Sequence, residues 1–295
     1  MIKFSAVEKR FRRNEVLKGI DLAIDRGQRV ALVGSNGAGK TTLIRCLLGE
    51  YKCKGKITID GLEPRASRQE VLSKVGFVPQ LPPPLRMPVG QLVRFAASLC
   101  HSDPQRMLDV SERLGFDARQ FRKQPFVKLS GGQKQKLLIA IALGRDTELL
   151  VMDEPAANLD PEARHILFSL LAEKQESCAM LISSHRLDEV ASLVNRVIEM
   201  DQGEVVLDDE VADLVDMASQ LDCRITMVQP EDAFIRALSD WNFRSTDPGH
   251  TVWAGKIAGP DRLRFLGMLS RYAALLSGVE MNETQVVVDS RENVA

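Results

Sequence analysis

The sequence is short of the features that mark membrane-spanning, secreted and strongly charged proteins. Its longest apolar run, Leu137 to Leu143, is far below the roughly 18 residues that a membrane-spanning helix needs. The first residues, Met-Ile-Lys-Phe-Ser, show no apolar block of the kind that forms a secretory signal. The 39 Lys and Arg against 40 Asp and Glu leave a formal net charge of −1. That balance argues against a strongly basic nucleic-acid binder and against an acidic disordered chain.

Aromatic residues and cysteines are also scarce. Aromatics make up 5% of the chain, so a packed core must be largely aliphatic. The five cysteines are scattered, odd in number and never at CxxC spacing: Cys46, Cys53, Cys100, Cys178 and Cys223. This pattern argues against a disulfide framework or a zinc site and favours a reducing, cytoplasmic compartment.

The chain does have a regular alternation of strand and helix patterns. Its 295 residues suggest one large domain or two small ones, taking roughly 150 residues per domain. Residues 2–6 and 20–24 alternate between apolar and polar, which predicts half-buried strands. Short apolar strands over 149–152 and 180–182 flank an expected helix over 161–174. Such alternation implies a parallel sheet covered by helices.

The composition changes near residue 204. Residues 204–216 carry six acidic side chains and no Lys or Arg, and we interpret this segment as the exit from the first domain. The predicted organisation is a domain over 1–210, a linker over 211–217 and a small α/β accessory domain over 218–295. The expected order in the last of these is β-α-β-β-α-β, a ferredoxin-like pattern. Its strands are expected near 223–227, 242–245, 250–257 and 285–288, and its helices near 234–241 and 260–276.

One motif is chemically specific. Residues Gly34 to Thr41, GSNGAGKT, match the whole phosphate-loop pattern. An apolar strand over 31–33 precedes the loop and a predicted helix over 42–48 follows it, which is the context that the motif requires. Glycines let the backbone wrap with its N–H groups inward, and the helix presents its positive end. We therefore expect the phosphates of a nucleotide to contact Ser35, Asn36, Gly37, Ala38, Gly39, Lys40, Thr41 and Thr42.

Charged and hydroxyl side chains complete the predicted site. Lys40 supplies a positive charge for the β- and γ-phosphates, and the Thr41 hydroxyl is a ligand for Mg2+. Asp153 ends the apolar strand, so its carboxylate emerges where ligands of parallel sheets bind. We expect Asp153 to help hold the cation and Glu154, the next residue, to polarise the attacking water. Two solvated carboxylates at a strand end would be the simpler interpretation without a phosphate loop.

A second motif resembles that of a known family. Residues Leu129 to Gln133, LSGGQ, open a helical run. With the phosphate loop and the Asp153–Glu154 pair, they resemble the nucleotide-binding subunit of ATP-binding-cassette (ABC) transporters over roughly residues 1–210. The resemblance implies a P-loop NTPase core of ABC type, an α/β fold with an antiparallel β subdomain and a helical subdomain over about 81–146. It also implies that two Mg-ATP are held in a head-to-tail dimer, each capped by four residues of the opposite chain: Ser130, Gly131, Gly132 and Gln133.

The resemblance carries over to four further positions. Gln80, after the apolar segment 75–78, corresponds to a glutamine that contacts magnesium and water and senses the membrane partner. His185 corresponds to a histidine that reaches the γ-phosphate. Asp160 belongs to a loop that crosses the dimer interface. Phe11 stands where the family has an aromatic ring stacked on adenine, and a core phenylalanine is the alternative there.

Four residues depart from the family's usual pattern. Ala156 stands where Ser or Thr is common, Phe11 replaces a more usual Tyr, and Lys134 and Lys136 replace arginines. None of these changes removes a phosphate, magnesium or water contact. The resemblance therefore implies ATP hydrolysis at two competent sites of a symmetric dimer.

The implied function is that of an ATP-hydrolysing subunit at the cytoplasmic face of a membrane. It would bind ATP and Mg2+, pair with a second copy or a similar ATPase subunit, and drive separately encoded transmembrane permease subunits, with no nucleic acid expected. The short helical segment and the C-terminal addition look more like exporters than sugar importers. The alternative is a soluble ABC-type ATPase acting on a ribosome or nucleic-acid complex. The C-terminal domain is expected to serve dimer contact or stability, with a regulatory ligand site as the alternative.

Overall fold

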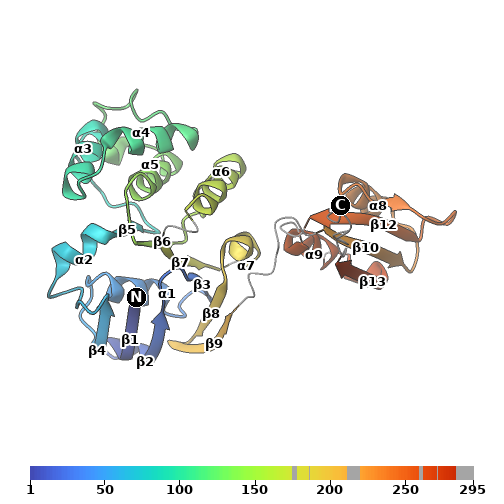
Figure 1. The fold of residues 1–295 in the computed structure, drawn as a ribbon, viewed down its shortest axis with the longest axis horizontal. Coiled ribbons are helices and arrows are strands. Elements are labelled where there is room, and N and C mark those ends of the chain that lie inside the picture. Colours follow the sequence, from blue (N-terminus) through green and yellow to red (C-terminus); the bar gives the residue numbers. More distant parts are fainter. Residues whose placement is uncertain (175–177, 186, 211–219, 259–261, 271, 284–295) are drawn as a thin grey trace, which may run out of the picture. The chain divides into compact units, whose positions relative to one another are not determined.

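Two units make up the structure, a computed structural model, and the chain passes from one to the other between Val211 and Ala212 (Figure 1). The structure describes residues 1–174, 178–185, 187–210, 220–258, 262–270 and 272–283. Each unit has a hydrophobic core made of its own residues. The cores beside the main sheet of the larger unit are almost wholly aliphatic, with Phe4 as the buried aromatic residue among those described.

The larger unit is built around a six-stranded sheet in the order β5-β6-β7-β3-β8-β9. The strands are β5 (Val75–Val78), β6 (Leu149–Asp153), β7 (Ala179–Ser184), β3 (Arg29–Val33), β8 (Arg196–Asp201) and β9 (Glu204–Glu210). The first five are parallel, and β9 runs antiparallel to β8. β6 and β7 are buried along their whole length, which is typical of a parallel sheet covered on both faces. The predicted parallel sheet is confirmed.

Alternate residues of this sheet face two different cores. Val30 and Leu32 of β3 pack in one core with α1 (Lys40–Leu47). Ala31, between them, packs in the other core with α6 (Pro161–Ala172). Because side chains of a strand alternate between faces, this period of two places one helix layer on each side of the sheet.

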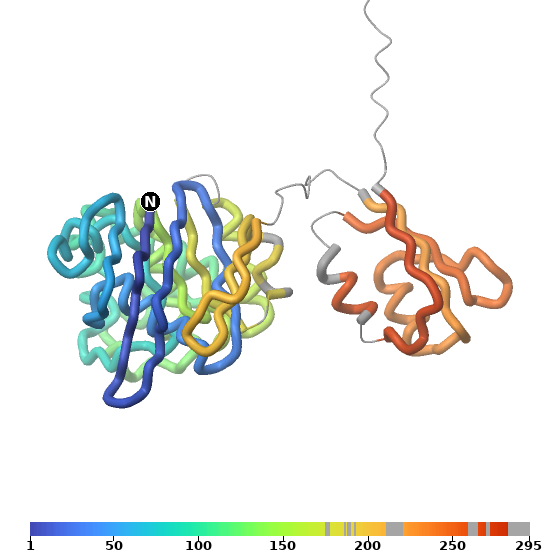
Figure 2. The backbone as a smooth tube through the Cα atoms, turned by 90° about the horizontal axis from the view of Figure 1, so that it is seen from below, coloured from blue at the N-terminus to red at the C-terminus, as the bar shows by residue number. Residues whose placement is uncertain are grey.

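A three-stranded antiparallel sheet forms the β subdomain, in the order β2-β1-β4. Its strands are β1 (Ile2–Phe11), β2 (Asn14–Ile24) and β4 (Lys54–Ile59). Figure 2 shows β1 and β2 running side by side as a hairpin. Their buried residues, Ile2 and Phe4 among them, join the same core as α1. The antiparallel β subdomain implied by the family resemblance is therefore present.

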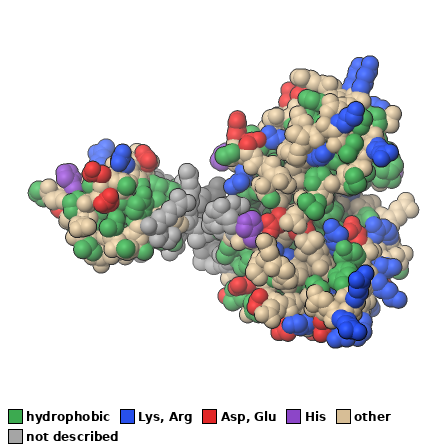
Figure 3. Space-filling view, turned by 180° about the vertical axis from the view of Figure 1, so that it is seen from behind, with side chains coloured by type: hydrophobic (Ala, Val, Ile, Leu, Met, Phe, Trp, Pro, Cys, Tyr) green, Lys and Arg blue, Asp and Glu red, His purple; other side chains and the backbone are tan. Residues whose placement is uncertain are grey.

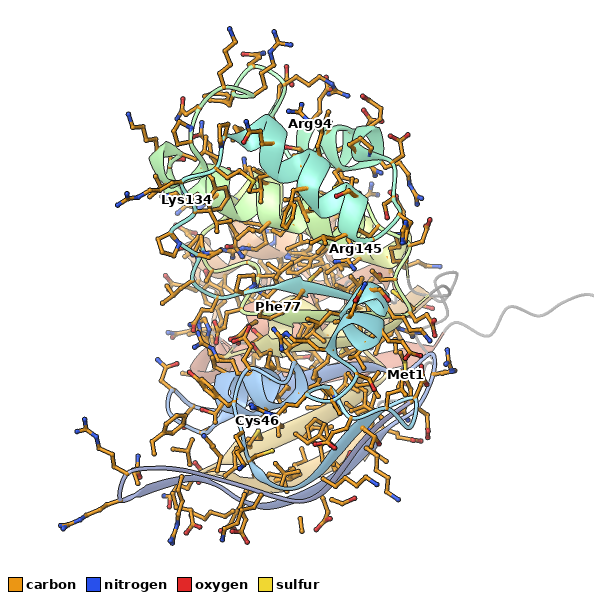
Figure 4. The ribbon with its side chains drawn as sticks, turned by 90° about the vertical axis from the view of Figure 1, so that its left-hand side faces the viewer. Met1, Cys46, Phe77, Arg94, Lys134 and Arg145 are labelled. Carbon is orange, nitrogen blue, oxygen red and sulfur yellow. The ribbon has the colours of Figure 1, made fainter. Side chains whose placement is uncertain are left out.

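The helical subdomain has a core of its own. It contains α3 (Val89–Leu99), α4 (Pro104–Arg113), the 3-10 turn η1 (Phe126–Lys128) and α5 (Gly131–Leu143). Asp103 caps α4 by accepting a hydrogen bond from Gln105 N, with Pro104 at the first helical position. Figure 4 shows Arg94, Lys134 and Arg145 in this subdomain at one end of the unit, with Phe77 of β5 below them. Three short helical segments complete the unit: α2 (Arg68–Lys74), α7 (Leu187–Val190) and η2 (Ala191–Leu193).

The smaller unit follows the order strand, helix, strand, strand, helix, strand. Its elements are β10 (Gln220–Met227), α8 (Asp232–Asp240), β11 (Arg244–Ser245), β12 (Val252–Ala258), α9 (Arg262–Ser270), the 3-10 turn η4 (Ala273–Leu275) and β13 (Leu276–Glu283). The sheet order is β11-β12-β10-β13, antiparallel throughout. This is the β-α-β-β-α-β order expected from the sequence pattern. Asp222 of β10 and Lys256 of β12 form an ion pair at 3.7 Å. Acidic and basic side chains lie near one another on the surface of the smaller unit (Figure 3).

Two predictions of elements were wrong in their extent. The helix expected over 260–276 ends at Ser270, and Leu276 instead begins β13. Leu276 packs against the core as the first residue of a strand. It is seven residues from Leu269, a spacing that also fits one face of a helix, and this led to the wrong prediction. The strand expected over 285–288 lies outside the described residues. The acidic segment 204–216 is not wholly a domain exit, because Glu204–Glu210 form the edge strand β9.

Candidate functional site

The carboxyl ends of four neighbouring strands carry most of the predicted site residues. β5, β6, β7 and β3 are parallel neighbours in that order. Because the carboxyl ends of parallel strands lie at one edge of the sheet, whatever follows each strand meets there. That edge receives Gln80 after β5, Asp153 and Glu154 at the end of β6, His185 after β7 and the loop 34–41 after β3.

The phosphate loop connects β3 directly to α1. Glycine is needed at Gly34, where φ is +145° and an added Cβ would lie 2.2 Å from the Met200 carbonyl oxygen. The exposed part of the loop is Ser35 to Gly37, whereas Ala38, Gly39 and Lys40 are buried. Lys40 Nζ donates hydrogen bonds to Gly34 O at 2.6 Å and to Ser35 O at 3.1 Å. The ammonium group thus lies inside the curve of the loop, where phosphate oxygens would be its competing partners.

Asp153 is buried at the end of β6, directly beside Ser183 of β7. In-register neighbours on parallel strands point their side chains to the same face, so these two meet. Ser183 Oγ donates a hydrogen bond of 2.6 Å to Asp153 Oδ1. The carboxylate is therefore held in a fixed orientation at the sheet edge.

Glu154 and His185 lie in contact at the same edge. Glu154 has φ +50°, the left-handed region that few side chains adopt, and only 9% of it is exposed. Its Oε2 atom lies 2.6 Å from His185 Nδ1. The Glu154 carboxylate therefore points to the histidine. The two residues predicted from separate motifs are brought together by the fold.

The donor set at this edge fits Mg2+. A magnesium ion in a nucleotide site takes one or two carboxylates, with phosphate and water oxygens as its other ligands. Asp153 supplies one carboxylate, Thr41 a hydroxyl on α1 and Gln80 a side-chain amide oxygen. α1 contacts β6, which brings the element that carries Thr41 to the strand that carries Asp153. Among the described residues, no cluster of three His, Cys, Asp or Glu could hold a metal ion without a ligand's help.

The LSGGQ residues begin α5 in the helical subdomain. Ser130 is the N-cap of this helix, and its hydroxyl accepts a hydrogen bond of 3.2 Å from Gln133 N. Gln133 Oε1 in turn accepts one of 3.0 Å from Ser130 N, which completes a capping box. Gly131 is exposed, and a Cβ added at Gly132 would lie 3.4 Å from Asn158 O. The structure therefore packs this motif against the loop after Glu154 and leaves its outer surface open.

Asp160 serves two partners within its own chain. Its carboxylate is the N-cap of α6, accepting from Ala163 N at 2.8 Å, and it lies 2.8 Å from Lys136 Nζ. The hydrogen bond from Lys136, followed by the one from Ala163, lowers the pKa of Asp160. Lys136 comes from α5, so this ion pair ties the two helices together. The role of Asp160 at a dimer interface stays a prediction.

Phe11 ends β1 with 40% of its surface exposed, so it is not a core phenylalanine. Its ring meets Tyr51 edge to face, with centroids 5.3 Å apart. Lys9 Nζ lies 4.6 Å from the Phe11 centroid. An adenine stacked on this ring would use the open face or displace the lysine.

Two buried polar residues of the site were missed by the sequence analysis. Ser183 bridges Asp153 to the Glu154 backbone, and Gln135 of α5 donates a hydrogen bond of 3.1 Å to Pro155 O. Neither has any exposed surface. The signal that could have found them is a polar residue inside an apolar pattern, as in Leu-Ile-Ser-Ser-His for Ser183.

Comparison with known protein families and sequences gives consistent matches. A family model described as "ABC transporter" matches residues 17–157. The chain is 32% identical over 280 residues to the Nod factor export ATP-binding protein I of Burkholderia lata, covering 89% of this chain and 88% of that protein. It is 30% identical to the energy-coupling factor transporter ATP-binding protein EcfA2 of Clostridium perfringens (82% and 89% covered). It is 33% identical to the SkfA peptide export ATP-binding protein SkfE of Bacillus subtilis (70% and 88%).

Solved structures match the larger unit's fold. An ATP-binding subunit of an ABC transporter aligns with a TM-score of 0.66 at 24% identity, over 72% of this chain and 91% of that one. CbiO1 from Clostridium perfringens, part of an ABC transporter complex, aligns with a TM-score of 0.58 at 29% identity, over 72% and 89%. In the part of the chain that the structure describes, none of the helices combines the length and hydropathy of a membrane span.

Proposed function

Because this chain belongs to the ABC transporter family as one of its ATP-binding subunits, we propose that it hydrolyses ATP at the carboxyl edge of its main sheet and drives separate membrane subunits. The observation that carries the site assignment is the 2.6 Å contact between Glu154 and His185 at the edge that also holds the phosphate loop. Four separate sequence motifs meet at that edge only because β5, β6, β7 and β3 are adjacent.

The proposed chemistry divides among this chain's own residues. The amides of the loop 34–41 and the Lys40 ammonium bind the phosphates, and Thr41, Asp153 and Gln80 hold Mg2+. When bound, the cation neutralises charge on the β- and γ-phosphate oxygens. Glu154 accepts a hydrogen bond from the attacking water and aligns it with the γ-phosphate. His185, whose Nδ1 lies 2.6 Å from Glu154 Oε2, holds the Glu154 carboxylate in that orientation.

The second part of the proposal is a head-to-tail dimer. The LSGGQ residues Ser130 and Gly131 are exposed, and the next residue, Gly132, lies beside Asn158 O. An exposed helix N-terminus offers N–H groups to an anion. We infer that they cap the ATP bound to a second copy of this chain or to a similar subunit.

We further propose that the transporter is an exporter and that this subunit works at the cytoplasmic face of the membrane. Two of the three relatives described above are named as export proteins. The match to the Nod factor export protein spans 89% of this chain, which is more than the 211 residues of the larger unit. It therefore extends into the smaller unit, the part that a minimal ATP-binding cassette does not need.

A Glu154→Gln substitution tests the proposed hydrolysis. The amide keeps the size of the side chain but removes the carboxylate that orients water, so kcat should fall by about 100-fold or more. ATP affinity should stay close to that of the wild type, because the loop and Lys40 are untouched. Steady-state phosphate release and binding of a fluorescent ATP analogue measure the two quantities. Normal turnover in this variant would refute the role of Glu154.

A further inference from the structure

Ser183 is the most constrained polar side chain at the sheet edge. It lies on β7 with no exposed surface, in register with Asp153 of β6. A buried hydroxyl without a hydrogen-bond partner destabilises the fold. Here the donor goes to Asp153 Oδ1 at 2.6 Å, and the acceptor receives Glu154 N at 3.0 Å.

The Ser183 hydroxyl bonds to the side chain of Asp153 and to the backbone of Glu154. The bond to Asp153 fixes the side chain of the proposed cation ligand. The hydroxyl donates to Oδ1 of Asp153. In the described part of the chain, no residue donates a hydrogen bond to Oδ2. The bond to Glu154 fixes a backbone N–H instead. One oxygen atom thus sets the position of Asp153 relative to Glu154.

The backbone of Glu154 needs such support. Its φ of +50° lies in the left-handed region, where the Cβ of an ordinary residue makes the conformation unfavourable. The N–H of Glu154 is also 3.2 Å from the Ser183 carbonyl oxygen, so both acceptors come from one residue. The strained turn aims the Glu154 carboxylate at His185, 2.6 Å away. Without the hydroxyl, the N–H of Glu154 would have only the more distant acceptor, the Ser183 carbonyl oxygen.

We propose that Ser183 is a positioning residue for ATP hydrolysis, because its hydroxyl holds the cation-binding carboxylate of Asp153 and the water-orienting Glu154 in one geometry. The proposal rests on the proposed function of these two residues. Partners that orient ligand side chains commonly change metal affinity or activity by about 10–100-fold when they are removed. Both side-chain bonds of Ser183 are made within the protein, so the proposed role needs no contact with the nucleotide or the cation.

A matched pair of variants isolates the hydroxyl. Ser183→Thr keeps the hydroxyl and Ser183→Val replaces it with a methyl group of nearly the same shape, and both add the same bulk to a buried strand position. We expect kcat of Ser183→Val to fall about ten-fold or more below that of Ser183→Thr, with little change in KM for ATP. Ser183→Thr should restore most of the wild-type kcat.

A second readout does not depend on turnover. Mn2+ in place of Mg2+, titrated with a non-hydrolysable ATP analogue and followed by electron paramagnetic resonance, reports how well Asp153 is oriented. The apparent Mn2+ affinity of Ser183→Val should fall by about ten-fold relative to Ser183→Thr. Equal kcat and equal Mn2+ affinity in the two variants would overturn the proposal.

Controls separate positioning from stability and from the proposed function itself. Ser111, on α4, is also fully buried, and its hydroxyl donates to Phe116 O at 2.5 Å in the helical subdomain. Ser111→Val should lower Tm but should keep the kcat of the wild type per folded protein. If kcat falls as much in Ser111→Val as in Ser183→Val, the effect of Ser183 is on stability and the positioning role is excluded. Activity of the wild type and its loss in Glu154→Gln decide the proposed function without reference to Ser183.

Discussion

At the scale of single residues, Phe11 offers the clearest test of nucleotide recognition. It is large and apolar, yet 40% of its surface is exposed at the end of β1. Its edge-to-face contact with Tyr51 holds the ring but leaves it open to a stacking partner. An exposed aromatic ring that is fixed by a neighbour, rather than buried, is suited to binding a flat ligand.

We expect Phe11→Ala to weaken ATP binding by about five-fold, because one aromatic stacking contact contributes roughly 1 kcal/mol. Phe11→Tyr keeps the ring and should bind ATP as the wild type does. Titration with a fluorescent ATP analogue measures both. If the alanine and tyrosine variants bind equally well, adenine does not stack at this position.

Residue types at the site were predictable where a motif has a fixed chemical meaning. The loop 34–41, Asp153 and His185 were all named from the sequence, and the fold places them at one edge of the sheet. The 2.6 Å contact between Glu154 and His185 was not predictable, because it depends on β6 and β7 being neighbours and on the φ of Glu154. Ser183 was missed for the same reason, since its partners come from the adjacent strand.

At the scale of elements, α5 links the LSGGQ motif to the loop between Glu154 and α6. Gln135 donates to Pro155 O, and Lys136 pairs with Asp160, the N-cap of α6. These two adjacent residues of α5 hold the helical subdomain against the segment that follows Glu154. The position of the exposed Ser130 therefore depends on these links.

Substitutions of Asp160 separate its two roles. Asp160→Asn keeps an oxygen that can cap α6 but loses the charge opposite Lys136, whereas Asp160→Ala loses both. We expect Asp160→Ala to lower Tm more than Asp160→Asn, and Lys136→Met to resemble Asp160→Asn. Thermal unfolding at low salt measures all three, and an equal Tm for the two Asp160 variants would mean that the cap is unimportant.

The pH dependence of the Asp160 effect has a definite sign. Its pKa is lowered in the folded state, chiefly by the hydrogen bond from Lys136, so the ionised form stabilises the fold. That stabilisation is fully present above the unfolded carboxyl pKa, near 3.8, and is lost as pH falls through the lower folded value. The Tm difference between the wild type and Asp160→Asn should therefore disappear in that acidic range.

Elements were predictable where apolar periodicity and flanking residues agreed. The apolar segments 31–33 and 75–78 named from the sequence lie in β3 (Arg29–Val33) and β5 (Val75–Val78), because both are short apolar runs. β9 was not recognised, because its acidic composition is unusual for a strand and is tolerated only at an exposed sheet edge. Arg196 of β8 pairs with Asp208 through two hydrogen bonds of 2.7 Å, which uses one of those acidic residues to hold the edge.

At the scale of the whole molecule, the two units have separate cores and different compositions. The core of the smaller unit contains Phe234, Phe243, Trp253 and Phe265, whereas the cores beside the main sheet of the larger unit are aliphatic. All of the proposed nucleotide-binding and catalytic residues lie in the larger unit. The low aromatic content of the whole chain thus reflects the larger unit more than the smaller one.

This separation predicts how a chain ending at residue 217 behaves. ATP affinity should change by no more than about two-fold, because all of the proposed nucleotide-binding residues lie in the larger unit, which has hydrophobic cores of its own. If the smaller unit serves dimer contact, as we expect from the sequence, the truncated Glu154→Gln variant should need a higher protein concentration than full-length Glu154→Gln to form the ATP-bound dimer. Analytical ultracentrifugation with ATP compares the two directly. If the two variants dimerise equally, the smaller unit does not serve dimer contact, and regulation or contact with a membrane partner remains as its role. If the truncated chain loses ATP binding, the two units are not independent.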